Sequence, residues 1–188
     1  MYPVGGNYYE FWQLYASNGT PTNPQSVSAI VMGSLADNGT PGANAAMITA
    51  AAGDIMPGEL SCATCLNHAL IAGGPWTLIN QTTGTQAPAE KNDGQCSSGG
   101  NVVLSEGAKL RFDPSVDVSS LNVSVAAQAI LRALQLYGAV LIDKGGNGTT
   151  CEQITGGIGF YSSVLVSPAP SLTADLTSAA GQHMWIYY

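Results

Sequence analysis

The segment that most limits the possible folds of this chain is a mostly apolar stretch from Val125 to Tyr137. Serine and asparagine residues, which can cap a helix, precede it, and Gly138, which can end one, follows it. We predict one α-helix at about 120–137. Because so apolar a helix has to bury most of its surface, we expect it to pack against a sheet.

Most of the remaining apolar segments are short and predict strands. Residues Ala108–Phe112 alternate apolar residues with Lys109 and Arg111, and residues 139–143 have the composition of a buried strand. Further strands are expected at 8–15, 27–32, 68–72, 76–79, 102–104, 160–166 and 182–188, and a short helix at 43–52 ending at Gly53. Many strands with one substantial helix predict a mostly β protein, a jelly-roll-like β-sandwich formed as a single domain by residues 1–188.

Five sequons of the Asn-x-Ser/Thr type offer acceptor sites for N-linked sugar. Three of them are the same tripeptide, Asn-Gly-Thr, and the five acceptors are Asn18, Asn38, Asn80, Asn122 and Asn147. Asn-Gly is also a common tight-turn pair, so turns without sugar are the alternative interpretation. At Asn122 a second alternative is a helix cap, since this residue lies where the helix is expected to begin. The sequons favour a secreted, extracellular glycoprotein.

Composition agrees with an extracellular protein and excludes some partners. Only 9% of residues are charged, and five Lys and Arg stand against twelve Asp and Glu, for a net charge of -7. Soluble domains carry about 25% charged residues, so hydroxyls, amides or attached glycans have to supply the polarity. Nucleic acid binding requires clustered cations, and we exclude it.

No apolar run is long enough to span a bilayer, so we expect no membrane span. Residues 1–15 have neither the basic nor the apolar region of an export signal. If the protein is secreted, we therefore expect this sequence to be a processed or partial form.

Four cysteines form an even set, which in an exported protein predicts two disulfides with three possible pairings. They are Cys62, Cys65, Cys96 and Cys151. A zinc site is an alternative for the Cys-x-x-Cys pair, but the other two cysteines are far apart in sequence and offer no second close pair. A thioredoxin-like redox pair is disfavoured because the surrounding βαβ pattern is absent. No calcium-type loop occurs, and we expect no metal or cofactor.

Several motifs resemble those of a family of secreted bacterial β-sandwich proteins of unassigned function. The most specific likeness runs from Gly107 to Asp143: Gly-Ala before a strand, Asp-Val-Ser at the helix entry, Ile-Leu-Arg-Ala-Leu within the helix, and Tyr-Gly before the next strand. The segment 54–58 and Asn67-His68-Ala69-Leu70 resemble further family segments. The resemblance implies a β-sandwich fold. The family's additional N-terminal portion, with an acidic proline-rich motif, is not found here, and Asn67 stands where the family has arginine.

A sandwich without its first strands would expose open sheet edges, which invite pairing with another chain. We therefore expect a structural subunit of a glycosylated fibril or surface layer, whose copies associate non-covalently, through sheet-edge complementation. The aromatic segments 8–15 and 185–188 suit this role, although pairing within the domain is the alternative for each. Residues 167–171, Ser-Pro-Ala-Pro-Ser, resemble the O-glycosylated modules of algal and plant wall proteins.

A secreted carbohydrate-active enzyme is the competing hypothesis. No pair of carboxylates suggests a hydrolase, but a lyase needs a base beside a cation, and His68, Arg111 and Tyr137 are the candidates if their strands are neighbours. Alternatively His68 is a structural residue, and Arg111 pairs with a nearby carboxylate. A carbohydrate-binding module would use Trp12, Trp76 or Trp185 as a stacking platform. We favour the structural, non-enzymatic role.

Overall fold

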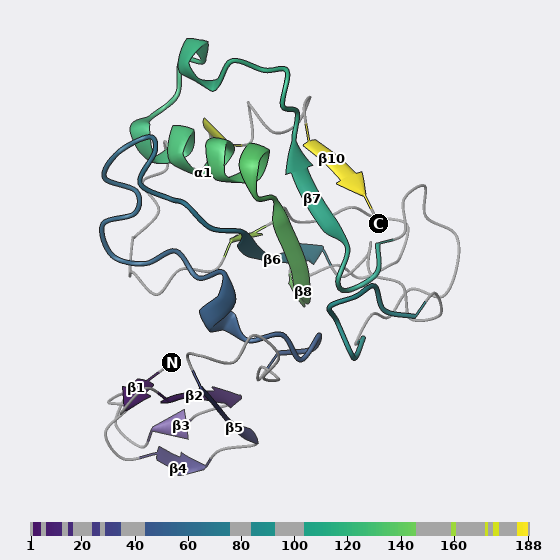
Figure 1. Ribbon diagram of the computed structural model, residues 1–188. Helices are drawn as coiled ribbons and strands as arrows, with labels where there is room; N and C mark the ends of the chain where they lie inside the picture. The colour runs from purple at the N-terminus through teal and green to yellow at the C-terminus, as the bar shows by residue number, and fades with distance from the viewer. Residues whose placement is uncertain are drawn as a thin grey trace.

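The computed structural model (Figure 1) describes residues 2–4, 7–12, 15–16, 24–26, 29–34, 44–75, 84–92, 104–145, 159–160, 172, 175–176 and 184–187. Its largest sheet has five strands in the order β10-β7-β8-β6-β9. These are β6 (Leu70–Pro75), β7 (Lys109–Phe112), β8 (Ala139–Gly145), β9 (Gly159–Phe160) and β10 (Met184–Tyr187). Only β6 and β8 run parallel, and the other neighbours are antiparallel.

The α-helix α1 (Val125–Leu136) packs on one face of this sheet. Its buried residues, among them Leu131 and Leu134, lie in one cluster with Leu110 and Phe112 of β7 and with residues of β6. The three apolar residues at alternate positions along 108–112 are completely buried, while Lys109 and Arg111 between them are partly exposed. The alternation in the sequence therefore identified the face of β7 that meets the helix.

The opposite face of the sheet is also covered at its centre. Ile71 of β6 and Ile142 of β8 point away from the helix cluster and form a second buried cluster with Ala46 and Ala89. Ile48 and Ala50, close to the 3-10 helix η1 (Ala50–Ala52), pack against it. A sheet buried on both faces explains why residues 70–72 of β6 and 139–142 of β8 are all apolar.

Helix α1 begins and ends where local chemistry dictates. Ser124 is the N-cap, and its hydroxyl accepts a hydrogen bond from the amide of Ala127 at 3.3 Å. Gly138, at a φ of 76°, follows the last turn and donates its amide to the carbonyl of Ala133 at 3.1 Å. Residues 121–124, included in the predicted helix, are not helical, and Ser120 is the last residue of a separate 3-10 helix, η3 (Val118–Ser120), whose N-cap is Asp117.

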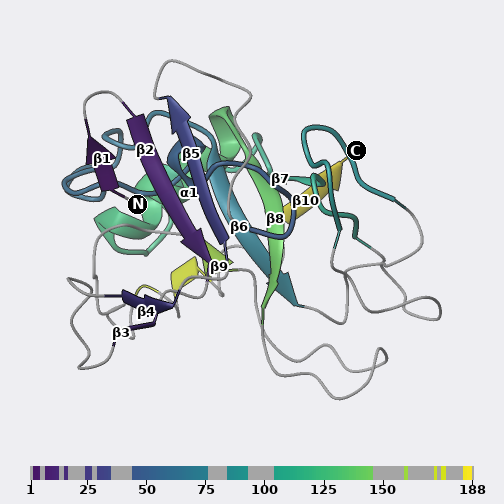
Figure 2. The same ribbon diagram turned by 90° about the horizontal axis from the view of Figure 1, so that it is seen from below.

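The N-terminal strands form two further sheets (Figure 2). One has the order β1-β2-β5, with β1 (Tyr2–Val4), β2 (Asn7–Trp12) and β5 (Ala29–Ser34) all antiparallel. The other is a pair formed by β3 (Tyr15–Ala16) and β4 (Pro24–Ser26). For these strands only the backbone pairing is described, so the β-sandwich remains a prediction.

Predicted and observed elements agree at the helix and at β7 and β8, whereas several other predicted elements differ from the structure in kind or extent. Instead of a helix at 43–52, the described residues show only the three-residue η1 directly before Gly53. Residues 73–75, predicted to separate two strands, continue β6, with an irregular register between Ala72 and Gly73. The predicted strand at 76–79 lies outside the described residues. Among the helices that the structure describes, none has the length and apolar character needed to cross a bilayer.

Candidate functional site

His68 lies two residues before β6, in the loop that leads from residue 54 into the sheet, and both of its ring nitrogens have acceptors. Nδ1 is 2.8 Å from the carbonyl oxygen of Ala69, and Nε2 is 3.0 and 3.1 Å from the two carboxylate oxygens of Glu59. Carbonyl and carboxylate oxygens only accept hydrogen bonds, so both nitrogens donate. The arrangement therefore favours the doubly protonated, positively charged imidazole.

Electrostatics agree with this protonation state. Burial of the ring lowers the pKa of His68, but the hydrogen bond to Ala69, the hydrogen bond and charge of Glu59, and the charge of Asp54 together outweigh it. The pKa of His68 is consequently raised above its ordinary value. A second hydrogen bond fixes the carboxylate of Glu59, since the amide of Met56 donates to Oε2 at 2.7 Å. The ion pair closes the loop between positions 59 and 68.

Replacing Glu59 by glutamine is expected to lower the pKa of His68, because the charge is lost while the hydrogen-bonding shape is kept. The pKa is higher in the folded than in the unfolded chain, so the pair stabilises the fold fully below the unfolded pKa. This stabilisation is lost as pH rises through the folded pKa. Between about pH 5 and about pH 9, the wild type should lose up to about 1 kcal/mol more unfolding free energy than Glu59→Gln.

Two-dimensional NMR of the imidazole protons, with His68→Ala to assign the signal among the two histidines of the chain, measures the pKa directly. Equal pKa values in the wild type and in Glu59→Gln would contradict the ion pair.

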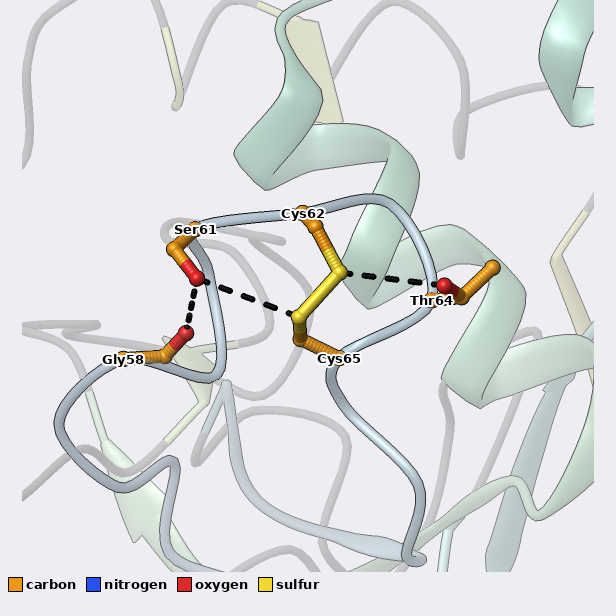
Figure 3. Close-up of a disulfide and its surroundings, with 5 residues drawn as sticks. All are labelled: Gly58, Ser61, Cys62, Thr64 and Cys65. Carbon is orange, nitrogen blue, oxygen red and sulfur yellow. Dashed lines mark hydrogen bonds between the residues drawn. A yellow bond between two sulfur atoms is a disulfide. The ribbon is translucent and has the colours of Figure 1, made fainter.

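A disulfide lies within the same loop, between Cys62 and Cys65 (Figure 3). Their Cα atoms are 5.3 Å apart. The hydroxyl of Ser61 donates to the carbonyl oxygen of Gly58 at 2.6 Å and also lies 3.8 Å from Cys65 Sγ. The predicted disulfide chemistry is thus confirmed for one pair, and this pairing removes the thiolates that the zinc alternative needs. Cys96 and Cys151 lie outside the described residues.

The loop is anchored to the core by apolar side chains as well as by these polar bonds. Ile55 and Leu66 are buried in the cluster beneath α1, and Leu60 packs against it. The disulfide closes only a short loop, for which the chain-entropy model gives about 2 kcal/mol of stabilisation. The loop therefore has three independent sources of order: apolar contacts, the Glu59–His68 ion pair and the disulfide.

Arg111, the second lyase candidate, binds the helix. Among the described contacts, none joins it to a carboxylate. Its Nε donates to the carbonyl oxygen of Gln135 at 3.0 Å, in the last turn of α1. A cation at this position also interacts favourably with the helix dipole. The side chain of Gln135 adds two hydrogen bonds in the same region, because its Nε2 donates to the carbonyl oxygens of Asp113 and Val116 at 2.7 and 2.8 Å. These bonds dock the C-terminal turn of α1 onto the end of β7.

The topology places the three lyase candidates at one end of three adjacent strands. Leu70 pairs with Ala139, and Ala139 pairs with Leu110, so His68, Tyr137 and Arg111 lie at or next to the same level of β6, β8 and β7. Tyr137 is exposed. The condition that their strands be neighbours is met. However, His68 and Arg111 already use polar atoms in the contacts described above, and a positively charged imidazole is not a base.

Asn122 is exposed, as a glycan acceptor has to be. The helix cap that was the alternative role for Asn122 is supplied instead by Ser124, which is also the hydroxyl residue of the sequon. The amide of Ser124 donates to Asp175 Oδ2 at 2.9 Å, and this bond lowers the pKa of Asp175. The remaining sequons, at Asn18, Asn38, Asn80 and Asn147, lie outside the described residues.

Ser124→Ala is expected to have two separable effects, because the hydroxyl serves both the helix and the sequon. It should lower the unfolding free energy of the deglycosylated protein by about 1 kcal/mol through loss of the cap, and it should abolish sugar at Asn122. Ser124→Thr keeps both functions, and Asn122→Gln removes only the sugar. Urea unfolding and glycopeptide mass spectrometry measure the two effects, and an unchanged stability in Ser124→Ala would contradict the cap.

Glu59 and Gln135 are the residues that sequence reasoning missed. Nothing in the sequence spacing of Glu59 and His68 marks them as a pair. Among the described residues, no group of three or more His, Cys, Asp or Glu side chains is placed to hold a metal ion.

Comparison of the chain with protein-family models, curated proteins and solved structures gave no match. The family resemblance inferred from the motifs therefore remains a prediction.

Proposed function

We propose that the protein is a structural subunit of an extracellular, glycosylated assembly, a fibril or surface layer built by strand pairing between copies. The observation that carries this proposal is the position of β10. It is the last strand of the five-stranded sheet and pairs with β7 on one side, with no strand on its other side among the described residues. Its sequence, Met-Trp-Ile-Tyr, has no charge and no proline. Natural edge strands usually carry such protective residues when they face water.

The hydrogen-bonding direction along the sheet indicates which groups of β10 are available. The amide of Leu141 donates to the carbonyl oxygen of Ala108, so position 108 faces β8. Backbone direction alternates along a strand, and positions 109 and 111 therefore face β10, opposite Tyr187 and Trp185. The amides and carbonyls of Met184 and Ile186 consequently face the open edge, where each bond to a neighbour would contribute about 1 kcal/mol.

Two further observations support an extracellular assembly. Asn122 is exposed beside the N-terminus of α1, so a glycan there would extend into solvent. The chain carries few charges, and a coat of sugar would supply the polarity that keeps its free faces dissolved.

Electron microscopy and sedimentation of the native protein, before and after enzymatic removal of glycans, test the proposal. Regular fibres or layers are expected, and Ile186→Pro should weaken them because it removes an outward amide without touching the bonds to β7. Ile186→Val is the matched control and should assemble as the wild type does. A wild-type protein that stays monomeric in both glycosylation states would refute the proposal.

A lyase is the second candidate, favoured by the shared level of His68, Tyr137 and Arg111 in the sheet. Its test is cleavage and binding of acidic and neutral polysaccharides by the wild type, Tyr137→Phe and His68→Ala. Cleavage lost in both variants, which should retain the fold, would favour the enzyme.

A further inference from the structure

We infer that the partner of β10 is β5 of a second copy, so that the two sheets of successive copies join edge to edge. This inference rests on the proposed function and names the contact that builds the assembly. Strand β5 is an edge of the three-stranded sheet β1-β2-β5, as β10 is an edge of the five-stranded sheet. Among the described strands, β5 and β10 thus each have one side without a neighbouring strand, and they belong to different sheets.

Of the two edges of the N-terminal sheet, β5 is the one suited to accept a strand. Strand β1 has three residues, with Pro3 at its centre, and proline is a common protective residue at sheet edges. Strand β5 has six residues, Ala-Ile-Val-Met-Gly-Ser, without charge or proline. Its length spans the four residues of β10, and neither strand brings a charge that pairing would have to desolvate.

The backbone groups of β5 that have no partner among the described strands alternate in the same way as those of β10. Pro3 has no amide hydrogen, so its pair with Tyr8 suits a non-hydrogen-bonded position. Hydrogen-bonded and non-hydrogen-bonded pairs alternate along an antiparallel ladder. The flanking pairs, Tyr2 with Tyr9 and Val4 with Asn7, are therefore the hydrogen-bonded ones. The backbone groups of the alternate residues of β2, at positions 8, 10 and 12, therefore face β5, where they pair with Gly33, Val31 and Ala29. The amides of Ile30 and Met32 therefore face the open edge, as those of Met184 and Ile186 do on β10.

Pairing of two different edges has a consequence for symmetry. A contact between β5 of one copy and β10 of the next is heterologous, and it leaves one β5 edge and one β10 edge free at the ends of every oligomer that has not closed. Such contacts propagate into an open filament or close into a ring. Pairing of β10 with β10 would instead stop at a two-fold dimer.

Two variants that each block one edge provide the test. Met32→Pro should block β5 and Ile186→Pro should block β10, each raising the protein concentration needed for assembly about tenfold or more. Mixed at equal concentration below that threshold, the two variants should form a discrete dimer of twice the monomer mass by sedimentation, and no fibres. In that dimer the intact β5 of one variant binds the intact β10 of the other. Met32→Leu and Ile186→Val are the matched controls and should assemble alone.

The outcomes separate the two proposals. A wild-type protein that stays monomeric would refute assembly itself. If the wild type assembles but the two variants form no mixed dimer, the β5–β10 contact alone is refuted. Unhindered growth of assemblies by Met32→Pro would refute that contact as well. Far-ultraviolet circular dichroism checks that the variants fold. If a proline variant is unfolded, a peptide of residues 29–34 with flanking lysines should inhibit growth of the wild type. The same peptide N-methylated at Ile30 and Met32 should not, and equal effects of the two peptides would contradict the inference.

Discussion

Replacing Gly107 by alanine should prevent stable folding, with a loss of unfolding free energy of about 4 kcal/mol or more. Gly107 lies in the turn before β7 at a φ of 86°, and a Cβ atom there would lie 1.6 Å from the carbonyl oxygen of Gln86. Both backbone segments are held by hydrogen bonds, which resist the shift that the Cβ atom would require. The amide of Gly107 is bonded to the carbonyl of Leu141 at 2.7 Å, and the amide of Gln86 to the carbonyl of Glu106 at 2.8 Å.

Gly84→Ala is the matched control for this substitution. Gly84 has a similar φ of 76°, but a Cβ atom there would have no neighbour within 4 Å. It should therefore incur only the backbone penalty, about 1 to 2 kcal/mol. Urea unfolding followed by circular dichroism measures both variants. Equal losses would show that conformation, not the approach of Gln86, makes glycine necessary at position 107.

The same turn matters for the proposed function, because it sets the start of the strand that holds the open edge. β7 pairs with β8 at Lys109 and Leu110 and with β10 along its whole length. A shift at Gly107 would displace β7 and with it the backbone groups of Met184 and Ile186. Loss of assembly in Gly107→Ala would consequently report loss of the fold, which is why the assembly tests use substitutions on the outer edge itself.

Local sequence signals predicted the parts of the fold that depend on neighbouring residues. The alternation around Lys109 and Arg111, the cap and the terminating glycine of α1 are all encoded within a few residues. The parallel pairing of β6 with β8 is not encoded in this way, because Leu70 and Ala139 are distant in sequence and meet only through the helix between β7 and β8. Gly73 and Gly74 were interpreted as a break for the same reason: their place beside β8 is a tertiary property.

The candidate site shows the same division. His68 and Arg111 were identifiable as chemically capable residues, but their partners were not. Glu59 reaches His68 across an irregular loop, and Gln135 reaches Asp113 and Val116 from a helix. Neither spacing has a period that a sequence pattern could display. The contact of Glu59 braces the loop, and the contacts of Gln135 dock the helix.

Leu131→Ala should destabilise the protein by about 3 to 5 kcal/mol, because it opens a cavity beneath α1. Leu131 is completely buried in the cluster that joins the helix to β6 and β7. Leu136 is the matched control on the same helix, since it is 70% exposed. Leucine and alanine have similar helix propensities, so Leu136→Ala should change the unfolding free energy by less than about 0.5 kcal/mol.

The pair of leucine variants also bears on where copies meet. If Leu136→Ala leaves both stability and assembly unchanged, the exposed end of α1 is free in the assembly, as contact through sheet edges requires. Assembly lost in Leu136→Ala at unchanged stability would instead place the helix end in an interface and would argue against strand pairing as the main contact. Sedimentation and urea unfolding together distinguish the two results, because sedimentation reports association with a neighbouring copy and urea unfolding reports the stability of the fold.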